Sequence, residues 1–118
     1  KIYTYSKCST CREALDFLTG HRQQFHEIAI REQPPSRDEL RRMLANYGGD
    51  IRRLFNTSGQ DYRALDLKTR LPRMSTDEAI DLLSRNGNLV KRPFLLTPGG
   101  GRVGFKEEEW SELLGLKR

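Results

Sequence analysis

The stretch YSKCSTCREALDFL, residues 5–18, places two cysteines three positions apart, between an apolar run and a helical pattern. Residues 1–5 (KIYTY) are β-branched and aromatic, which predicts a short buried strand. After the cysteines, apolar residues recur at helical spacing as far as Gly20. Residues 25–30 (FHEIAI) are again typical of a strand. Strand, helix and strand within thirty residues predict a right-handed parallel βαβ unit.

The segment 33–88 is predicted to be mainly helical and to cover one end of the sheet. Two Ser-x-x-Glu capping boxes, each followed by glycine, predict its first and last helices. The capping pairs are Ser36 with Glu39 and Ser75 with Glu78, and the expected stop positions are Gly48 or Gly49 and Gly87. Between them, residues 50–59 and 60–68 are expected to form two shorter helical pieces around a turn at NTSG, residues 56–59.

The last third of the chain predicts a hairpin and a helix. The strand-like runs RPFLLT (92–97) and RVGF (102–105) flank PGGG, so we expect an antiparallel pair. Residues 106–116 follow with three acidic residues in the first helical turn, where they suit the helix dipole. The whole order, βαβ, helices and ββα, predicts a single α/β domain over residues 1–118 with a mixed sheet.

Size and charge narrow the class of protein. The 118 residues suffice for one core, and no run approaches the ~20 apolar residues of a membrane span. The chain start does not resemble a signal peptide, so we expect a cytoplasmic protein without membrane contact. Lys and Arg number 21 against 16 Asp and Glu, which favours anionic partners. Direct nucleic-acid binding is not expected, because no aromatic-basic signature or recognition helix is present.

The two cysteines suit redox chemistry. If a helix begins near Cys8, its free backbone N–H groups and its dipole stabilise a thiolate there, and Lys7 and Arg12 add positive charge. Cys11 lies about one turn further along, within reach of a Cys8 sulfur that has formed a mixed disulfide. In a reducing compartment a close cysteine pair is more often catalytic, redox-sensing or metal-binding than structural.

Two other interpretations of the pair stay open. The cysteines could be small inert residues of the core, because free cysteine is often buried. They could also bind zinc with His21 and His26. The nine residues between Cys11 and His21 have a helical pattern and are too few for a zinc finger, so no metal is expected.

Arg92 and Pro93 stand at the start of a late strand. A cis bond between them would aim Arg92 toward an anion, although a trans bond with Arg92 in solvent is the commoner arrangement.

These motifs, in this order, resemble the ArsC/Spx family, which comprises glutaredoxin-coupled arsenate reductases, Spx transcriptional regulators and YffB-like proteins. The resemblance covers nearly the whole chain, and it implies a thioredoxin/glutaredoxin-like fold with a helical insert at approximately 33–88. The segments that carry it are YSKCSTCR, PPSRDEL, LFNTSGQDYRALDL, KRPFLLTPGG and RVGF.

The resemblance also implies roles for individual residues. Cys8 resembles the nucleophilic cysteine, Arg92 the arginine that holds an oxyanion beside it, and Pro93 the neighbouring cis-proline. Arg12 follows the active-site loop as in the arsenate reductases. The resulting candidate catalytic residues are Cys8, Cys11 and Arg92, and the candidate substrate-binding residues are Lys7, Ser9, Thr10, Arg12, Asn56 and Pro93.

Three positions depart from the arsenate reductase pattern. Asn56 stands where those enzymes carry a second anion-binding arginine, as in the YffB-like proteins. A third arginine falls near Phe105, in the form found in Spx and YffB. Cys11 stands where the glutaredoxin-coupled enzymes usually have another residue and where Spx has the second cysteine of its redox switch.

Two functions follow. The favoured one is a thiol-dependent oxidoreductase without a bound cofactor, which acts on a small oxyanion such as arsenate, or on a thiol or disulfide. The resemblance implies glutathione with glutaredoxin, or thioredoxin, as the reductant. The alternative is an Spx-like regulator in which oxidation of Cys8 and Cys11 switches binding of the basic helical insert to RNA polymerase, at the C-terminal domain of its α subunit.

Overall fold

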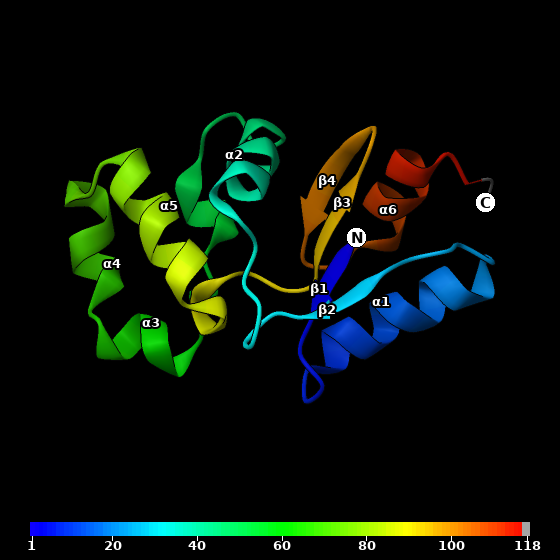
Figure 1. Ribbon diagram of the computed structural model, residues 1–118, viewed down its shortest axis with the longest axis horizontal. Coiled ribbons are helices and arrows are strands. Elements are labelled where there is room, and N and C mark those ends of the chain that lie inside the picture. Colours follow the sequence, from blue (N-terminus) through cyan, green and yellow to red (C-terminus); the bar gives the residue numbers. More distant parts are fainter. Residues whose placement is uncertain (117–118) are drawn as a thin grey trace.

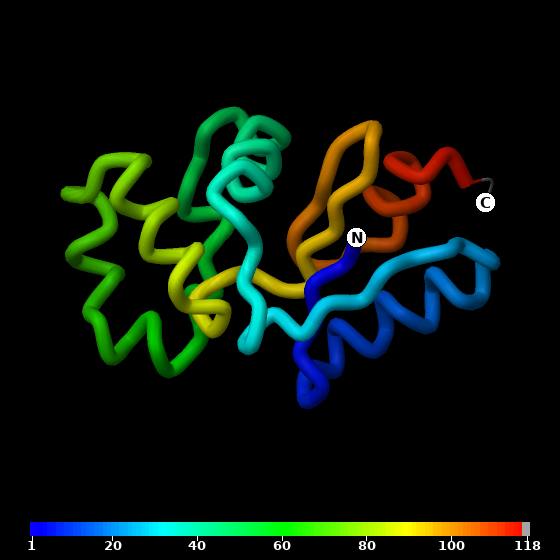
Figure 2. Tube along the Cα trace, viewed as in Figure 1, coloured from blue at the N-terminus to red at the C-terminus, as the bar shows by residue number. Residues whose placement is uncertain are grey.

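The computed structural model describes residues 1–116; Lys117 and Arg118, the last two residues of the predicted domain, lie outside the described part. Figure 1 shows a sheet half with helices α1 and α6 beside a half made of the other helices. The chain crosses into the helical half after β2, and it returns to the sheet after α5, as the cyan and yellow segments of Figure 2 show. No helix among residues 1–116 is long and apolar enough to cross a membrane.

The sheet is mixed, as the sequence predicts. Its strands are β1 (Ile2–Thr4), β2 (Glu27–Ala29), β3 (Phe94–Thr97) and β4 (Gly100–Val103), in the order β2-β1-β3-β4. β1 pairs with β2 in parallel, whereas β1 with β3 and β3 with β4 are antiparallel. The predicted βαβ unit and late hairpin are therefore both confirmed.

Alternate residues of the central strands face two different hydrophobic clusters, because side chains along a strand point to opposite faces. Ile2 and Leu95 pack with α1 (Ser9–Gly20) and with Trp110 of α6 (Glu107–Leu114). Tyr3 and Phe94 pack instead with the helices of the insert. The sheet is thus buried on both faces, and the insert covers a face of the sheet.

Among the described residues, the insert contains four α-helices and three short 3₁₀ helices. Its elements are α2 (Arg37–Ala45), η1 (Ile51–Leu54), α3 (Gln60–Ala64), α4 (Leu67–Arg70), η2 (Leu71–Arg73), α5 (Thr76–Arg85) and η3 (Gly87–Leu89). Both predicted capping boxes are present at the starts of α2 and α5. Each box satisfies two backbone N–H groups that a helix start leaves without an intrahelical partner.

Several boundaries differ from the predictions. α2 ends at Ala45 rather than at Gly48 or Gly49. Beyond Ala45, the N–H groups of residues 46–48 bond to carbonyls three residues back rather than four, so the chain tightens out of the α-helix. The side chain of Tyr47 accepts a hydrogen bond from the Val103 N–H of β4 at 2.9 Å. The two glycines then form the exit turn with positive φ.

The second difference lies in the hairpin, where Gly100 and Gly101 belong to β4 rather than to the loop. A Cβ on Gly101 would stand 2.8 Å from the Met43 side chain, so the glycine permits α2 to pack closely on β4. In the middle of the insert, the predicted piece 60–68 is divided into α3 and α4 at Asp66, which has a left-handed backbone.

Candidate active site

Cys8 is the N-cap of α1. Its backbone is extended, with φ −103° and ψ 113°, and its Sγ accepts a hydrogen bond from the Cys11 N–H at 3.2 Å. The residue is half-buried and makes no disulfide. Free N–H groups and the positive end of a helix dipole are general features that favour negative charge at an N-cap, and the Cys8 sulfur lies at such a position.

Cys11 also has a free thiol, but unlike Cys8 it is buried. Burial, the largest cause, and a hydrogen bond to Cys8 raise the pKa of Cys11 to about 12. The charge of Cys8 raises it as well, whereas a backbone hydrogen bond at Tyr5 and the charge of Arg92 lower it. Burial above all, with the contribution of Cys8, therefore favours the neutral thiol of Cys11.

Arg92 lies beside Tyr5, and it is close enough to Cys11 for its charge to act on that thiol. Its bond to Pro93 is cis, and the proline ring is buried at the start of β3. The guanidinium carbon of Arg92 stands 4.7 Å from the centroid of the Tyr5 ring. Tyr5 in turn accepts a hydrogen bond from the Cys8 N–H through its carbonyl oxygen, at 3.1 Å. The cation and the candidate nucleophile thus share one neighbouring residue.

Two cavities meet at Arg92. The first, called here the Tyr5 cavity, has a volume of about 300 Å³ and is lined by Tyr5, Arg31, Asn56, Gly59, Gln60, Asp61, Asn88 and Arg92. The second, the Thr10 cavity, measures about 340 Å³ and is lined by Thr10, Arg53, Lys91, Arg92, Val103, Gly104, Phe105, Lys106 and Glu109. Cationic side chains predominate over anionic ones in both linings, so each cavity favours an anionic group.

The structure brings some of the predicted site residues together and leaves others apart. Asn56 lines the Tyr5 cavity, Thr10 lines the Thr10 cavity, and Arg92 lines both. The other predicted site residues line neither cavity; they are the exposed Lys7, Ser9 and Arg12, the half-buried Cys8, and the buried Cys11 and Pro93.

Sequence reasoning missed several residues of the Tyr5 cavity, above all Arg31 and Asp61. A signal for Arg31 existed. Tyr5 directly follows β1 and Arg31 lies two residues beyond β2, and ligands of α/β sheets commonly bind outside the carboxyl ends of parallel strands. Asp61 had no such signal, because it comes from a helix of the insert whose position only the tertiary fold determines.

The histidines of the zinc alternative lie on the surface. His21 and His26 are exposed, and the His21 ring stacks against Phe17 with centroids 4.4 Å apart. Within residues 1–116, no group of three or more His, Cys, Asp or Glu side chains is arranged to hold a metal ion.

Several known proteins are similar in sequence to this chain. The uncharacterized protein YusI of Bacillus subtilis is 47% identical over 113 residues, which cover 94% of each chain. The global transcriptional regulator Spx of Streptococcus mutans is 30% identical, over 92% of this chain and 77% of Spx. An arsenate reductase of Acidiphilium multivorum is 31% identical, over 86% of this chain and 71% of that enzyme.

The fold agrees with a solved structure of similar size. A possible arsenate reductase from Streptococcus mutans superimposes with a TM-score of 0.85 at 41% identity, over 93% of this chain and 95% of that one. The sequence profile described as the ArsC family matches residues 3–113, nearly the whole chain. The family match and the structural similarity both extend over nearly the whole chain, and the chain belongs to the ArsC family.

Proposed function

We propose that this protein is a thiol-dependent oxidoreductase in which Cys8 is the nucleophile. The observation that carries the proposal is the N-cap geometry, with the Cys8 sulfur accepting the Cys11 N–H and the Cys11 thiol one turn away. Only a thiolate attacks a disulfide, and a helix start is where thiolates are stabilised. Residues 1–118 would act as one domain, because the Tyr5 cavity has residues from the sheet half and from the insert.

The first step is attack on an oxidised sulfur. The Cys8 thiolate bonds to one sulfur of a disulfide R–S–S–R, the S–S bond breaks, and one half leaves as a thiolate that takes a proton from water. Arg92 would stabilise the negative charge of the leaving group, because it lines both cavities and its charge already acts on Cys11. The exposed Lys7, Ser9 and Arg12 and the half-buried Thr10 would contact the departing half.

The second step uses Cys11. Once Cys8 is in a mixed disulfide it has no charge, so the repulsion and the hydrogen bond that help to raise the Cys11 pKa disappear. Arg92 still lowers that pKa. The Cys11 sulfur then attacks Cys8, the second half of the substrate leaves as RSH, and a Cys8–Cys11 disulfide remains. Glutathione with glutaredoxin, or thioredoxin, would reduce it in the cytoplasm, where thiols are kept reduced.

A disulfide is a better-matched substrate than arsenate. By the family resemblance, arsenate reductases hold the oxyanion with three arginines, and two of those positions are Asn56 and Phe105 here. With arsenate, Cys8 would bond to arsenic with loss of water, and attack of a second thiol on the Cys8 sulfur would give a disulfide and arsenite. The two thiols supply the two electrons of that reduction.

The test compares two isosteric variants of the reduced protein. Cys8→Ser is expected to abolish reaction with 2-hydroxyethyl disulfide, because the nucleophile is absent. Cys11→Ser is expected to form a mixed disulfide that mass spectrometry detects as one added mercaptoethanol. Reaction of Cys8→Ser at the wild-type rate, or failure of Cys11→Ser to retain the adduct, contradicts the respective step.

One observation favours a regulatory function instead. Cys11 occupies the position of the second switch cysteine by resemblance, and the similarity to Spx spans 92% of this chain. In that case the oxidised and reduced forms would differ in how they bind RNA polymerase, at the C-terminal domain of its α subunit. A pull-down with that domain decides: absence of binding in both redox states excludes this function.

A further inference from the structure

The Tyr5 cavity carries two guanidinium groups on one aromatic ring. The carbons at the centres of the Arg31 and Arg92 guanidinium groups stand 5.0 and 4.7 Å from the Tyr5 ring centroid, and Arg31 donates a hydrogen bond to the Tyr5 hydroxyl at 2.9 Å. The electron-rich ring face offsets part of the repulsion between the two cations. No ion pair among the described residues involves either arginine. Their charge is therefore available to an anion in the cavity.

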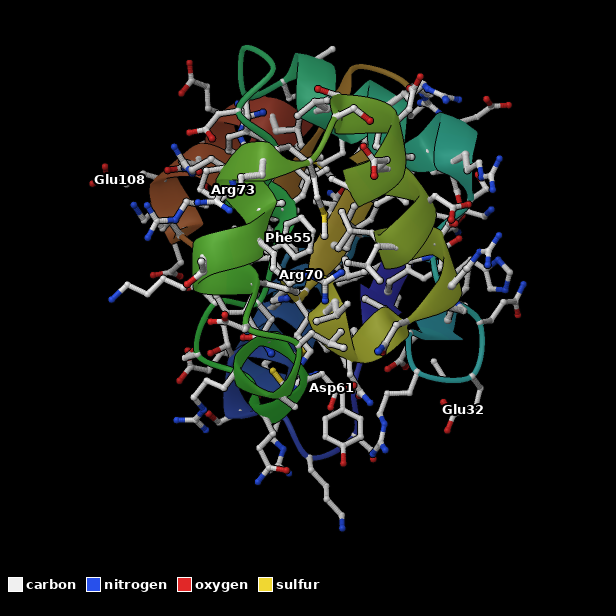
Figure 3. All side chains as sticks on the ribbon, turned by 90° about the vertical axis from the view of Figure 1, so that its left-hand side faces the viewer. Glu32, Phe55, Asp61, Arg70, Arg73 and Glu108 are labelled. Carbon is white, nitrogen blue, oxygen red and sulfur yellow. The ribbon has the colours of Figure 1, made fainter. Side chains whose placement is uncertain are left out.

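The insert contributes a carboxylate to the same cavity. Asp61 of α3 accepts hydrogen bonds from the side-chain amides of Asn86 at 3.0 Å and Asn88 at 3.4 Å. Both donors are neutral amides, so these hydrogen bonds hold the Asp61 side chain in position without pairing it with a cation. Figure 3, which looks onto the insert, shows Asp61 below Arg70 and Arg73 and away from them. The cavity thus has cations from the sheet half and an anion from the insert.

This charge pattern fits a zwitterion better than a simple anion. A free phosphate or arsenate in the cavity would meet the Asp61 carboxylate as well as the arginines. An α-amino-carboxylate group carries both charges a few ångströms apart, so its carboxylate can bind the arginines while its ammonium group binds Asp61. The side-chain amides of Asn56 and Asn88 line the space between and can donate or accept further hydrogen bonds.

We propose that the Tyr5 cavity binds the α-amino-carboxylate end of a small disulfide substrate, with Arg31 and Arg92 on the carboxylate and Asp61 on the ammonium. The inference rests on the proposed function of Cys8. A volume of about 300 Å³ accommodates an amino-acid-sized group. Cys8 does not line this cavity, but it lies three residues after Tyr5 and donates its N–H to the Tyr5 carbonyl at 3.1 Å. The disulfide of a ligand held in the cavity would therefore extend past Tyr5 to reach the Cys8 sulfur. Arg31 is then a specificity-determining residue of this reaction.

Four disulfides of similar length distinguish the effect of a substrate carboxylate from that of a substrate ammonium group. Cystine carries both groups, 3,3′-dithiodipropionate only carboxylates, cystamine only ammonium groups, and 2-hydroxyethyl disulfide neither. The reduced full-length protein converts one disulfide into two thiols and becomes the Cys8–Cys11 disulfide, so no other reductant is needed. The rate constant for each compound is measured under single-turnover conditions and divided by its rate constant with free mercaptoethanol, which corrects for intrinsic reactivity.

The wild-type protein is expected to react fastest with cystine on this corrected scale. Arg31→Gln should lower the corrected rate constants for cystine and dithiodipropionate by about tenfold, which is the effect of one charge-assisted hydrogen bond at a partly exposed site. The rate constants for the other two compounds should stay within about twofold of wild type. Asp61→Asn, which keeps an oxygen for Asn86 and Asn88, should slow cystine and cystamine and spare dithiodipropionate. Arg73→Gln removes the same charge outside the cavity and should change none of the four selectively.

The other outcomes overturn the inference. Equal corrected rates for the four compounds, an equal slowing of all four by Arg31→Gln, or the same selectivity loss in Arg73→Gln would each exclude the binding site while leaving the role of Cys8 intact. If the wild-type protein reacts with none of the four compounds, the proposed function itself is overturned. Thermal unfolding of each variant by circular dichroism confirms that the rates come from folded protein.

Discussion

Replacing Gly87 by alanine tests how the insert returns to the sheet. Gly87 is buried at the start of η3, and an added Cβ would stand 1.9 Å from the carbonyl oxygen of Ile30 and 2.7 Å from its carbonyl carbon. Because these are backbone atoms, no side-chain rotation relieves the overlap. The two backbone segments must separate by at least 1.1 Å, the difference between 1.9 Å and the 3.0 Å below which real Cβ contacts are essentially never found.

This separation has a calculable effect on stability. Overpacking a well-filled interior costs about 1–3 kcal/mol, and a clash between two backbones belongs at the upper end of that range. For 118 residues, an unfolding entropy of about 2.1 cal/mol/K per residue means that each kcal/mol lowers Tm by roughly 4 °C. We therefore expect Gly87→Ala to destabilise the protein by about 3 kcal/mol and to lower Tm by roughly 12 °C.

Urea unfolding followed by the fluorescence of Trp110, the single tryptophan, measures the change. Gly20→Ala is the matched control, because a Cβ at Gly20 meets nothing within 4 Å at the end of α1. That variant should be neutral or gain up to about 1 kcal/mol. A Gly87→Ala protein within about 0.5 kcal/mol of the Gly20→Ala protein, a threshold near the usual error of such comparisons, would refute the packing argument.

Three further predictions concern the site and the core. The Cys11→Ser protein should retain its Cys8 adduct at every pH. In wild type the adduct should resolve faster as pH rises, because Cys11 is buried and must ionise to attack, and a pH-independent rate contradicts this. Burial tends to raise the pKa of Glu39, but its hydrogen bonds from Tyr3, the Ser36 backbone and Lys1 outweigh burial and lower that pKa. The stability from Glu39 is thus present above pH 4.5, its ordinary pKa, and is lost as pH falls, so Glu39→Gln should flatten the acid side of the stability profile. Trp110→Phe should cost about 2 kcal/mol in urea unfolding followed by circular dichroism, since it removes the indole hydrogen bond to the Gly104 carbonyl and leaves a space in the core. A loss under about 0.5 kcal/mol would mean that the site collapses without cost.

The features that could be predicted from sequence are those with local causes. A capping box needs only a serine and a glutamate three residues apart, so the starts of α2 and α5 could be found without knowledge of the fold. The same holds for Cys8 at the N-cap of α1 and Cys11 in its first turn, because a helix start and its N-cap lie within four residues. The family resemblance added that the helical segment is an insert between two halves of one fold. It also implied that Arg92 acts beside Cys8, which stays a prediction.

The features that sequence missed depend on contacts between distant segments. Arg31 and Asp61 line one cavity only because the insert folds back beside the end of β2. Likewise, Tyr47 bonds to Val103, 56 residues away, and Met43 lies against Gly101. Apart from the place of Arg31 just beyond β2, none of these contacts has a short-range signal in the chain.

The alternation along β1 has a consequence for how the molecule opens. Ile2 and Tyr3 are neighbours in sequence, yet each belongs to a different hydrophobic cluster, so one three-residue strand contributes side chains to both clusters. Detaching the insert would bare the face that carries Tyr3 and Phe94 to water. Amide hydrogens of β1, β3 and α5 should therefore exchange with solvent through one common unfolding event rather than half by half.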